Sequence, residues 1–241
     1  MGLNLHDPAF VGVTGTPAEF SPNSISSLER WYDASVGITK DGDDLVSVWL
    51  TQDEGTAKRI RQTGSGDQPK WYSEAQNGHD IVDFGNQTSN MGTFDDTVEI
   101  SQPLTTFAVI EFPPNDGNNH YLNSSRNGGA NEQSSFVKSS GANAWEIQAG
   151  ATLTASASVT ETWGYMCCLF SGSDSYIRIN GVEIAQGDAG STLHNPMTLG
   201  ATYANTNHWS SGVMHYGICS DELSSGDLAS LESWMADQAG L

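Results

Sequence analysis

Alternation of apolar and polar side chains is clearest between Tyr176 and Ala185, where Asn180–Gly181 interrupts the pattern. Because a type I′ turn needs positive φ at both central residues, Asn-Gly between two alternating runs is a strong signal for a β-hairpin. A two-residue turn predicts three cross-strand pairs: Ile179 with Val182, Arg178 with Glu183, and Ile177 with Ile184. The predicted hairpin has an aliphatic face and, on the other face, an ion pair between the strands. A slip of one residue would bury that pair, so the register is well specified.

Two further stretches, Trp163–Phe170 and Thr105–Phe112, are apolar at most positions rather than at every second one. A strand that is apolar on both faces belongs in the centre of a sheet that a second layer covers. Pro113 and Pro114 end the second of these stretches, because proline cannot donate to a β-ladder. Together with the hairpin, these strands predict an all-β fold in which two antiparallel sheets pack as a sandwich.

Helical spacing is convincing only near the C-terminus, in residues 224–239. Ser224 is suited to cap a helix, with Asp227 three residues later in a capping-box arrangement, and Gly240 supplies a C-terminal stop. One face carries apolar side chains, those of Leu228, Leu231 and Met235, with Trp234 beside them. We expect this helix to pack across the edge of the sandwich.

The length of 241 residues suits one large sandwich domain that needs no disulfide or metal to form its core. We place this domain at residues 20–241, because residues 1–19 have no periodicity and are interrupted by proline and glycine. An apolar patch within the first segment contains Phe10, Val11 and Val13. We expect an extended N-terminal arm whose patch docks on its own domain or on a neighbouring protein; a strand that closes the sheet is the alternative.

Charge and composition limit the partners. The net charge is -20, from 29 acidic and 9 basic side chains, so the surface repels nucleic acid and anionic membranes. The first residues lack the basic and apolar regions of a signal peptide, and no apolar run is long enough to span a membrane. We expect a protein that is made in a cytoplasm, with reduced, buried thiols at Cys167, Cys168 and Cys219.

Sequence motifs in a fixed order suggest a family. They are Phe20-Ser-Pro-Asn-Ser-Ile25, Leu28-Glu-Arg-Trp-Tyr-Asp-Ala-Ser35, Leu45-Val-Ser-Val-Trp49, Pro69-Lys-Trp-Tyr72, Ile81-Val-Asp-Phe84, the Asn-Gly hairpin and the terminal Gly240-Leu241. This set resembles the concanavalin A-like (laminin G-like) jelly-roll domains of phage and bacterial surface proteins. The resemblance implies a two-sheet antiparallel jelly-roll sandwich with an N-terminal arm and one C-terminal helix. It is less specific for function, because one fold hosts many sites.

The acidic side chains of the sequence do not match a known catalytic motif of this fold. Glucanases of this fold resemble one another in a Glu-Xaa-Asp-Xaa-Glu strand whose carboxylates act as nucleophile and acid, and this spacing is absent here. The nearest acidic group, Asp95, Asp96 and Glu99, is better explained by a solvated turn. The six histidines are scattered. The sequence does not rule out a Ser-His-Asp triad, although nothing points to one. We therefore predict that the chain is not an enzyme.

Oxygen-rich loops raise the question of calcium, which lectin-like jelly rolls often carry. The candidates are Asp41, Asp43 and Asp44 in one loop and Asn115-Asp-Gly-Asn-Asn119 in another. Such oxygens suit hard cations, but neither loop has the spacing of an EF-hand. Asp, Asn and Gly are also ordinary turn residues. We therefore predict no cofactor and keep calcium as the alternative.

Sugar binding needs exposed aromatic faces beside amide or carboxylate groups. One polar loop offers both, with Tyr203, Asn205, Asn207, His208 and Trp209 as candidates, and His120-Tyr121 after the Asn-rich loop is a second candidate. For Trp209, packing against the edge of the sandwich is the competing interpretation and the favoured one.

The function that these observations favour is a non-enzymatic structural protein on the surface of a phage virion. We expect a capsid decoration or tail accessory chain that docks on other virion proteins, without a signal peptide, and forms a symmetric oligomer such as a trimer. One alternative is a carbohydrate-binding module that recognises host surface glycans. Another is a cryptic glycoside hydrolase.

Overall fold

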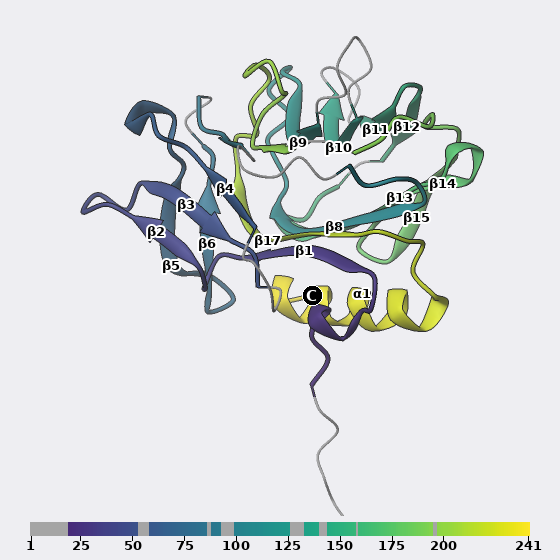
Figure 1. The fold of residues 1–241 in the computed structure, drawn as a ribbon, viewed down its shortest axis with the longest axis horizontal. Helices are drawn as coiled ribbons and strands as arrows, with labels where there is room; N and C mark the ends of the chain where they lie inside the picture. The colour runs from purple at the N-terminus through teal and green to yellow at the C-terminus, as the bar shows by residue number, and fades with distance from the viewer. Residues whose placement is uncertain are drawn as a thin grey trace, which may run out of the picture.

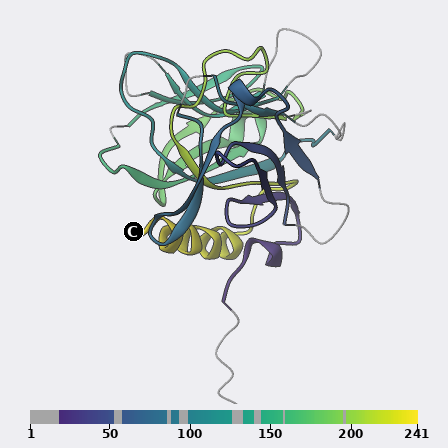
Figure 2. The ribbon, with the colours of Figure 1, turned by 90° about the vertical axis from the view of Figure 1, so that its left-hand side faces the viewer.

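Two antiparallel sheets face one another, and a helix lies under one of them (Figure 1). The computed structural model describes residues 19–52, 58–85, 88–92, 99–125, 133–139, 144–157, 159–194 and 197–241. Residues 1–18 of the predicted N-terminal arm, with Phe10, Val11 and Val13, lie outside the described residues. Figure 2 shows the layers from the side, with the helix beneath both sheets. The all-β sandwich with one C-terminal helix is confirmed.

Sheet A has eight strands in the order β15-β14-β13-β8-β17-β6-β5, and β1 also pairs with β17. Its strands are β1 (Leu28–Asp33), β5 (Lys70–Gln76), β6 (His79–Asp83), β8 (Leu104–Glu111), β13 (Trp163–Phe170), β14 (Ser175–Ile179), β15 (Val182–Gly187) and β17 (Gly212–Cys219). Both stretches that are apolar on two faces, β8 and β13, are central and pair with each other. Their position agrees with the prediction.

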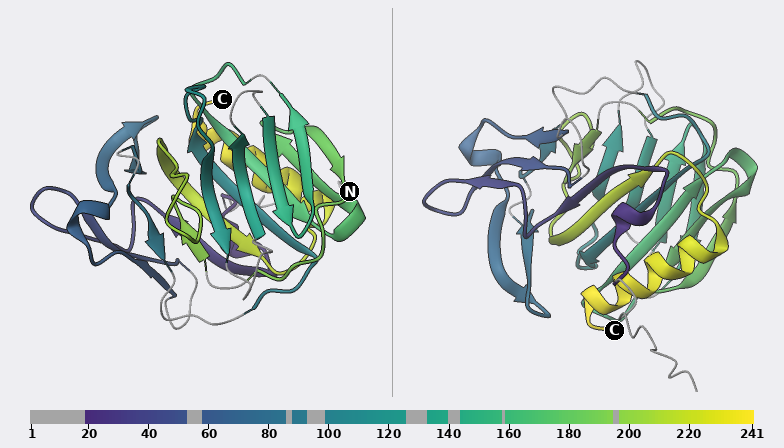
Figure 3. Two further views of the ribbon diagram at one scale, coloured as in Figure 1. Left: turned by 90° about the horizontal axis from the view of Figure 1, so that it is seen from above. Right: turned by 60° about the horizontal axis from the view of Figure 1, so that its bottom comes forward.

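Sheet B has nine strands in the order β12-β11-β10-β9-β16-β7-β4-β3-β2. They are β2 (Ile38–Lys40), β3 (Val46–Leu50), β4 (Arg59–Arg61), β7 (Met91–Gly92), β9 (His120–Ser125), β10 (Gln133–Ser139), β11 (Ala144–Ala149), β12 (Thr152–Ser156) and β16 (Met197–Leu199). Short 3-10 helices, η1 (Pro22–Ser24), η2 (Ser65–Asp67) and η3 (Gly172–Asp174), lie in the connections. In the view from above, strands of the two sheets are drawn over one another and α1 lies behind them (Figure 3, left).

The β14–β15 hairpin forms around Asn180 and Gly181, whose φ angles of 48° and 78° suit the predicted turn. Two of the predicted cross-strand pairs are present, Ile179 with Val182 and Arg178 with Glu183. A bulge then shifts the register, so that Ile177 opposes Ala185 rather than Ile184. The predicted ion pair is wrong in its partner. Arg178 instead binds Glu232 of the C-terminal helix, with Nε 2.7 Å from Oε1.

Helix α1 (Ser225–Ala239) has the caps that the sequence predicts. The Ser224 hydroxyl accepts a hydrogen bond from the Asp227 backbone N–H at 3.1 Å, and Gly240 ends the helix with a φ of 81°. The predicted position at the edge of the sandwich is wrong. The helix lies across the outer face of sheet A (Figure 3, right), where Leu231 and Met235 are buried against side chains from β8 and β13.

Sheet A therefore separates two apolar clusters. The inner core, between the sheets, contains Trp49, Phe84, Trp145 and Trp209 among its buried side chains. The helix-side core lies between sheet A and α1. Cys167 faces the helix-side core and Cys168 the inner core, as neighbours in a strand must, and all three cysteines are buried and free. Among the described residues, no helix has the length and apolar character that crossing a bilayer requires.

Candidate functional site

Two connections meet at the start of β9. The first runs from Glu111, the last residue of β8, to His120, and the second is the loop of residues 200–211 between β16 and β17. The Tyr121 N–H donates to the Asn207 carbonyl at 3.2 Å, and Tyr121 forms a parallel bridge with His208. In Figure 1 the second loop, in yellow-green, lies beside β9 at the top of the molecule. Polar side chains that are far apart in the sequence are thereby brought together.

The 200–211 loop takes its shape from local chemistry. Asn205 and Asn207 have φ angles of 58° and 51°, a left-handed conformation that asparagine tolerates better than most residues. Gly200 has a φ of 86°, and a Cβ there would lie 2.2 Å from Phe84, so only glycine fits. Trp209 anchors the far end of the loop, because its ring is fully buried in the inner core and its backbone N–H donates to the Gly200 carbonyl at 2.8 Å.

A pocket of about 200 Å³ opens where the two connections meet. It is lined by amide and imidazole side chains, those of Asn118, Asn119, His120, Asn207 and His208. Amides offer both donors and acceptors, and a neutral imidazole offers one of each. The pocket wall is thus suited to a polar, hydroxyl-bearing ligand.

Asp116 and His120 form a hydrogen-bonded pair at this site. His120 Nε2 lies 2.9 Å from Asp116 Oδ1, and the Asn118 backbone N–H and side-chain amide each donate to the same carboxylate at 2.9 Å. The slight burial of Asp116 would raise its pKa, but these three hydrogen bonds outweigh that effect and lower the pKa to about 2. Asp116 is therefore ionised under all ordinary conditions, and its hydrogen bond keeps a proton on His120 Nε2.

Lys138 lies behind this pair on β10, directly opposite His120 in the strand register. Its side chain is only 7% exposed, and Nζ donates to the Pro113 carbonyl at 2.6 Å. Burial lowers the pKa of Lys138, and the charge of Asp116 opposes that shift. The buried ammonium group thus ties the start of the 113–119 segment to sheet B.

His208 forms the opposite wall of the pocket. Its Nε2 lies 3.1 Å from Asn205 Oδ1, an oxygen that also accepts from the Asn90 side chain at 2.6 Å. Since that oxygen can only accept, Nε2 must donate, which leaves Nδ1 of a neutral ring as an acceptor. Burial lowers the pKa of His208, with Asp67 opposing, so the ring is neutral at pH 7. The Asn207 side-chain amide makes no hydrogen bond with other described residues.

Only some of the residues that the sequence predicts for sugar binding line the pocket. Asn207 and His208 line the pocket, while Asn205 orients His208. Tyr203 is 38% exposed in the same loop, and Tyr121 is half-buried on β9. Trp209 has an exposed fraction of 0% and packs in the inner core, which agrees with the favoured interpretation of packing and removes Trp209 as a ligand contact.

Several residues of the site were not predicted from the sequence to contact a ligand. The Asn115–Asn119 segment was considered only for calcium, although an Asn-rich loop directly before His120 was a usable signal. No local pattern points to Lys138 or Ser210. Both reach the site through strand pairing and loop closure over long sequence distances.

The Asp41–Asp44 loop behaves as a turn. Asp41 Oδ1 accepts from the backbone N–H groups of Asp43 and Leu45, each at 2.9 Å, and Asp44 pairs with Lys40. Among the described residues, no cluster of three or more His, Cys, Asp or Glu side chains is arranged to hold a metal ion. Calcium binding there stays an untested alternative.

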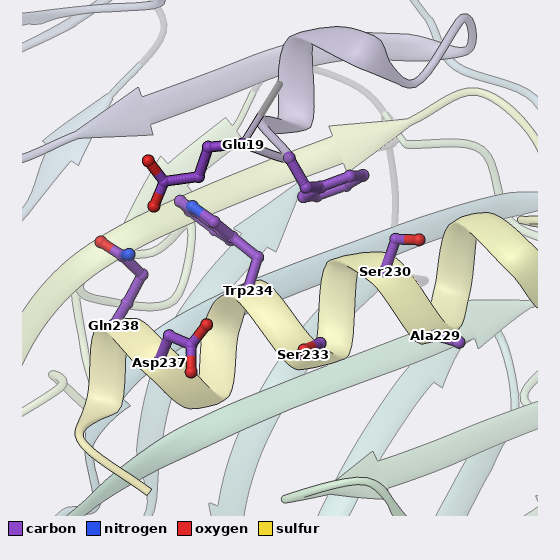
Figure 4. Close-up of a pocket in the computed structure, with 8 residues that line it drawn as sticks. Glu19, Ala229, Ser230, Ser233, Trp234, Asp237 and Gln238 are labelled. Atoms are coloured by element: carbon purple, nitrogen blue, oxygen red, sulfur yellow. The ribbon is translucent and has the colours of Figure 1, made fainter. Parts of the chain in front are cut away.

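A second hollow lies between the start of the described chain and the outer face of α1 (Figure 4). It has a volume of about 390 Å³, and Glu19, Trp234, Asp237 and Gln238 are among its lining residues. Figure 4 shows Trp234 pointing toward Glu19, with serine side chains along the helix. This hollow lies where the predicted N-terminal arm joins the domain, at Glu19 and Phe20.

Comparisons with known proteins agree on the fold. No family model and no curated protein matches the sequence. A sialidase of Trypanosoma rangeli in complex with sialic acid matches with a TM-score of 0.60 and 11% identity, over 88% of this chain and 33% of the sialidase. A GH54 α-L-arabinofuranosidase gives 0.57 and 9%, over 81% of this chain and 51% of the other. The binding domain of botulinum neurotoxin serotype D/C gives 0.50 and 9%, over 87% and 52%.

These neighbours have β-sandwich folds of the lectin type, which is consistent with the concanavalin A-like fold that the sequence resembles. The chain spans about a third of the sialidase and about half of the other two. The prediction that the chain is not an enzyme is contradicted, because a sialidase and an arabinofuranosidase are enzymes and share this fold. The missing Glu-Xaa-Asp-Xaa-Glu strand therefore does not separate this chain from carbohydrate-active enzymes.

Proposed function

We propose that this chain is a carbohydrate-binding β-sandwich domain whose ligand site is the pocket between the 113–119 and 200–211 segments. The observation that carries the proposal is the pocket lining of three asparagines and two histidines within a volume of about 200 Å³. Pockets for drug-sized ligands are larger and mostly apolar, ~300–1,000 Å³. A small, wholly polar pocket suits a single sugar ring, whose hydroxyl groups both donate and accept.

Available hydrogen-bonding groups and an exposed aromatic ring support the same ligand class. The Asn207 amide has no partner among the described residues, and His208 presents a free acceptor, so both can bind hydroxyl groups without breaking an internal hydrogen bond. Tyr203, on the same loop, is exposed enough for a sugar face to stack on it. The sugar-directed names of the sialidase and the arabinofuranosidase favour this class as well.

The setting we propose for this domain is the surface of a phage particle. Its support is the resemblance of the sequence to phage and bacterial surface jelly rolls, together with the net charge of -20. In that setting residues 1–19 attach the domain to other virion proteins, and copies of the chain form a symmetric oligomer, with a trimer as the expected state. A protein inventory of purified particles tests the setting, and absence of the chain from them would contradict it.

A glycan array followed by titration tests the binding site. We expect saturable binding that the Asn207→Gly variant weakens about tenfold, or about 1.4 kcal/mol. Glycine keeps the left-handed backbone of Asn207 and removes only the amide. The matched control is Asn77→Gly, at a second left-handed asparagine (φ 49°) in the β5–β6 turn, far from the pocket in sequence. Equal affinity in both variants, or no saturable glycan at all, would refute the proposal.

A further inference from the structure

A serine completes a hydrogen-bonded chain through His120, one of the residues that line the pocket. Ser210 Oγ lies 3.1 Å from His120 Nδ1, on the opposite side of the ring from Asp116, whose Oδ1 is 2.9 Å from Nε2. The three residues come from different segments: the connection before β9, the first residue of β9, and the end of the 200–211 loop. Carboxylate, imidazole and hydroxyl are thus aligned in the order that nucleophilic catalysis by serine requires.

Hydrogen-bond roles in this chain follow from the carboxylate. Asp116 is ionised and can only accept, so Nε2 of His120 carries a hydrogen. In a neutral ring Nδ1 then has the free electron pair, and the Ser210 hydroxyl donates to it. In the familiar serine-protease triad, Nε2 of the histidine faces the serine and Nδ1 faces the carboxylate. In this protein Nδ1 faces Ser210 and Nε2 faces Asp116. Either imidazole nitrogen can act as the base.

The site also accommodates the charged ring. The His208 carbonyl lies 3.3 Å from His120 Nδ1, on the same side as Ser210. Once Nδ1 has accepted a proton, it can donate to this carbonyl, while Nε2–H continues to donate to Asp116. Both N–H groups of the imidazolium are then satisfied, although the side chain is only 2% exposed. A base that can hold its proton in a shielded site is what a hydrolytic cycle needs.

We propose that Ser210 and His120 cleave the ester bond that joins an acyl group to an oxygen of an O-acylated sugar. Asp116 is the residue that positions the imidazole. The choice of a sugar as the substrate rests on the proposed function, because the sugar is taken to be the ligand of the same pocket. An ester fits the groups at hand. Cleavage of a glycosidic bond usually employs a pair of carboxylates, whereas acyl transfer needs a hydroxyl nucleophile and a base.

The reaction balances with water as the only co-reactant. Ser210 Oγ attacks the ester carbonyl carbon as His120 Nδ1 takes the hydroxyl proton. The tetrahedral intermediate expels the sugar oxygen, which takes that proton and leaves as an alcohol, and the acyl group stays on Ser210. Water, deprotonated by the same Nδ1, then releases the carboxylic acid and restores the serine. The Asn207 amide, which has no side-chain partner among the described residues, is a pocket donor available to the oxyanion.

Hydrolysis of p-nitrophenyl acetate and release of acetate from acetylated monosaccharides are the assays. We expect the full chain to hydrolyse both, and Ser210→Ala to lose at least about 100-fold in kcat/KM with an unchanged melting temperature. Ser220→Ala, at an exposed serine after β17, is the matched control and should keep full activity. Asp116→Asn should lower kcat with little change in KM, which a purely structural role would not produce.

Labelling of the unaltered chain keeps the test independent of variant folding. A fluorophosphonate probe should modify Ser210, as peptide mass spectrometry would show, and should not modify Ser220. The alternative role for the three residues is to pin the two segments together. No labelling of Ser210, or activity that survives in Ser210→Ala, would overturn the proposal in favour of that role. Glycan binding without any ester hydrolysis would leave the binding function standing and remove only this one. Hydrolysis of p-nitrophenyl acetate without glycan binding would leave the ester-cleaving role of Ser210 and His120 standing. It would remove glycan binding, and with it the sugar as the substrate.

Discussion

Removal of Glu232 should destabilise the protein more than removal of any other acidic side chain near the hairpin. Arg178 Nε and Nη2 donate to the two carboxylate oxygens of Glu232 at 2.7 and 3.0 Å, and Nη2 also donates to the Gly181 carbonyl. The side chains of Arg178 and Glu232 are 21% and 12% exposed, so water screens the pair only in part. Hydrogen bonds to charged groups contribute about 1.5–3 kcal/mol each when buried. Allowing for partial exposure, we expect Glu232→Ala to cost about 2 kcal/mol.

Urea unfolding followed by tryptophan fluorescence measures this loss, which corresponds to a fall of about 4–8 °C in melting temperature for a domain of this size. Glu183→Ala is the matched control, because Glu183 stands opposite Arg178 across the hairpin but makes no ion pair with it among the described contacts. We expect that control to change stability by less than about 0.5 kcal/mol. A double-mutant cycle with Arg178→Ala isolates the pair. Equal losses for the two glutamate variants would refute the assignment of Glu232 as the partner.

Three further predictions concern buried groups. Burial lowers the pKa of His194 to about 3 and of His215 to about 4, with Asp33 opposing in the second case, whereas both titrate near 6.5 when unfolded. As the pH falls, the unfolded chain therefore takes up protons before the folded one. The free energy of unfolding should be constant above pH 7 and fall by about 1 kcal/mol per pH unit for each histidine between pH 6 and 4. A melting temperature that does not change over that range would contradict this. Trp209→Ala should cost about 3–5 kcal/mol through the cavity it leaves, and Trp209→Phe clearly less, as measured by denaturant unfolding. A thiol reagent should find no reactive cysteine in the native protein and three after denaturation, because burial raises the pKa of every thiol.

Local chemistry explains which parts of the fold could be predicted from the sequence. The turn at Asn180–Gly181 and the limits of α1 depend on residues within a few positions of one another, so propensity and capping rules suffice. The partner of Arg178 does not follow from such rules, because Glu232 is distant in sequence and meets it only when the helix docks. The helix pattern likewise identifies an apolar face without saying whether an edge or a sheet face receives it.

The candidate site divides in the same way. Asn207 and His208 were found because a polar loop with amides and aromatics is visible in one short segment. For Trp209 the sequence left packing and ligand contact both open, with packing favoured, because the burial of an aromatic ring in a loop is decided by the core that surrounds it. His120 and Ser210 are adjacent only because β9 and the 200–211 loop close on each other, and no spacing in the sequence announces that contact.

The place of β1 has a consequence for synthesis of the chain. Among the described strands, its partner is β17, near the opposite end of the sequence, and α1 follows β17 directly. β1 therefore leaves the ribosome well before β17 and has no strand neighbour of its own sheet until β17 has been made. Sheet A can close only at that late stage, and until then the apolar strands β8 and β13 have no cover on the helix side. A nascent chain of this kind depends on chaperones or on rapid completion to escape aggregation.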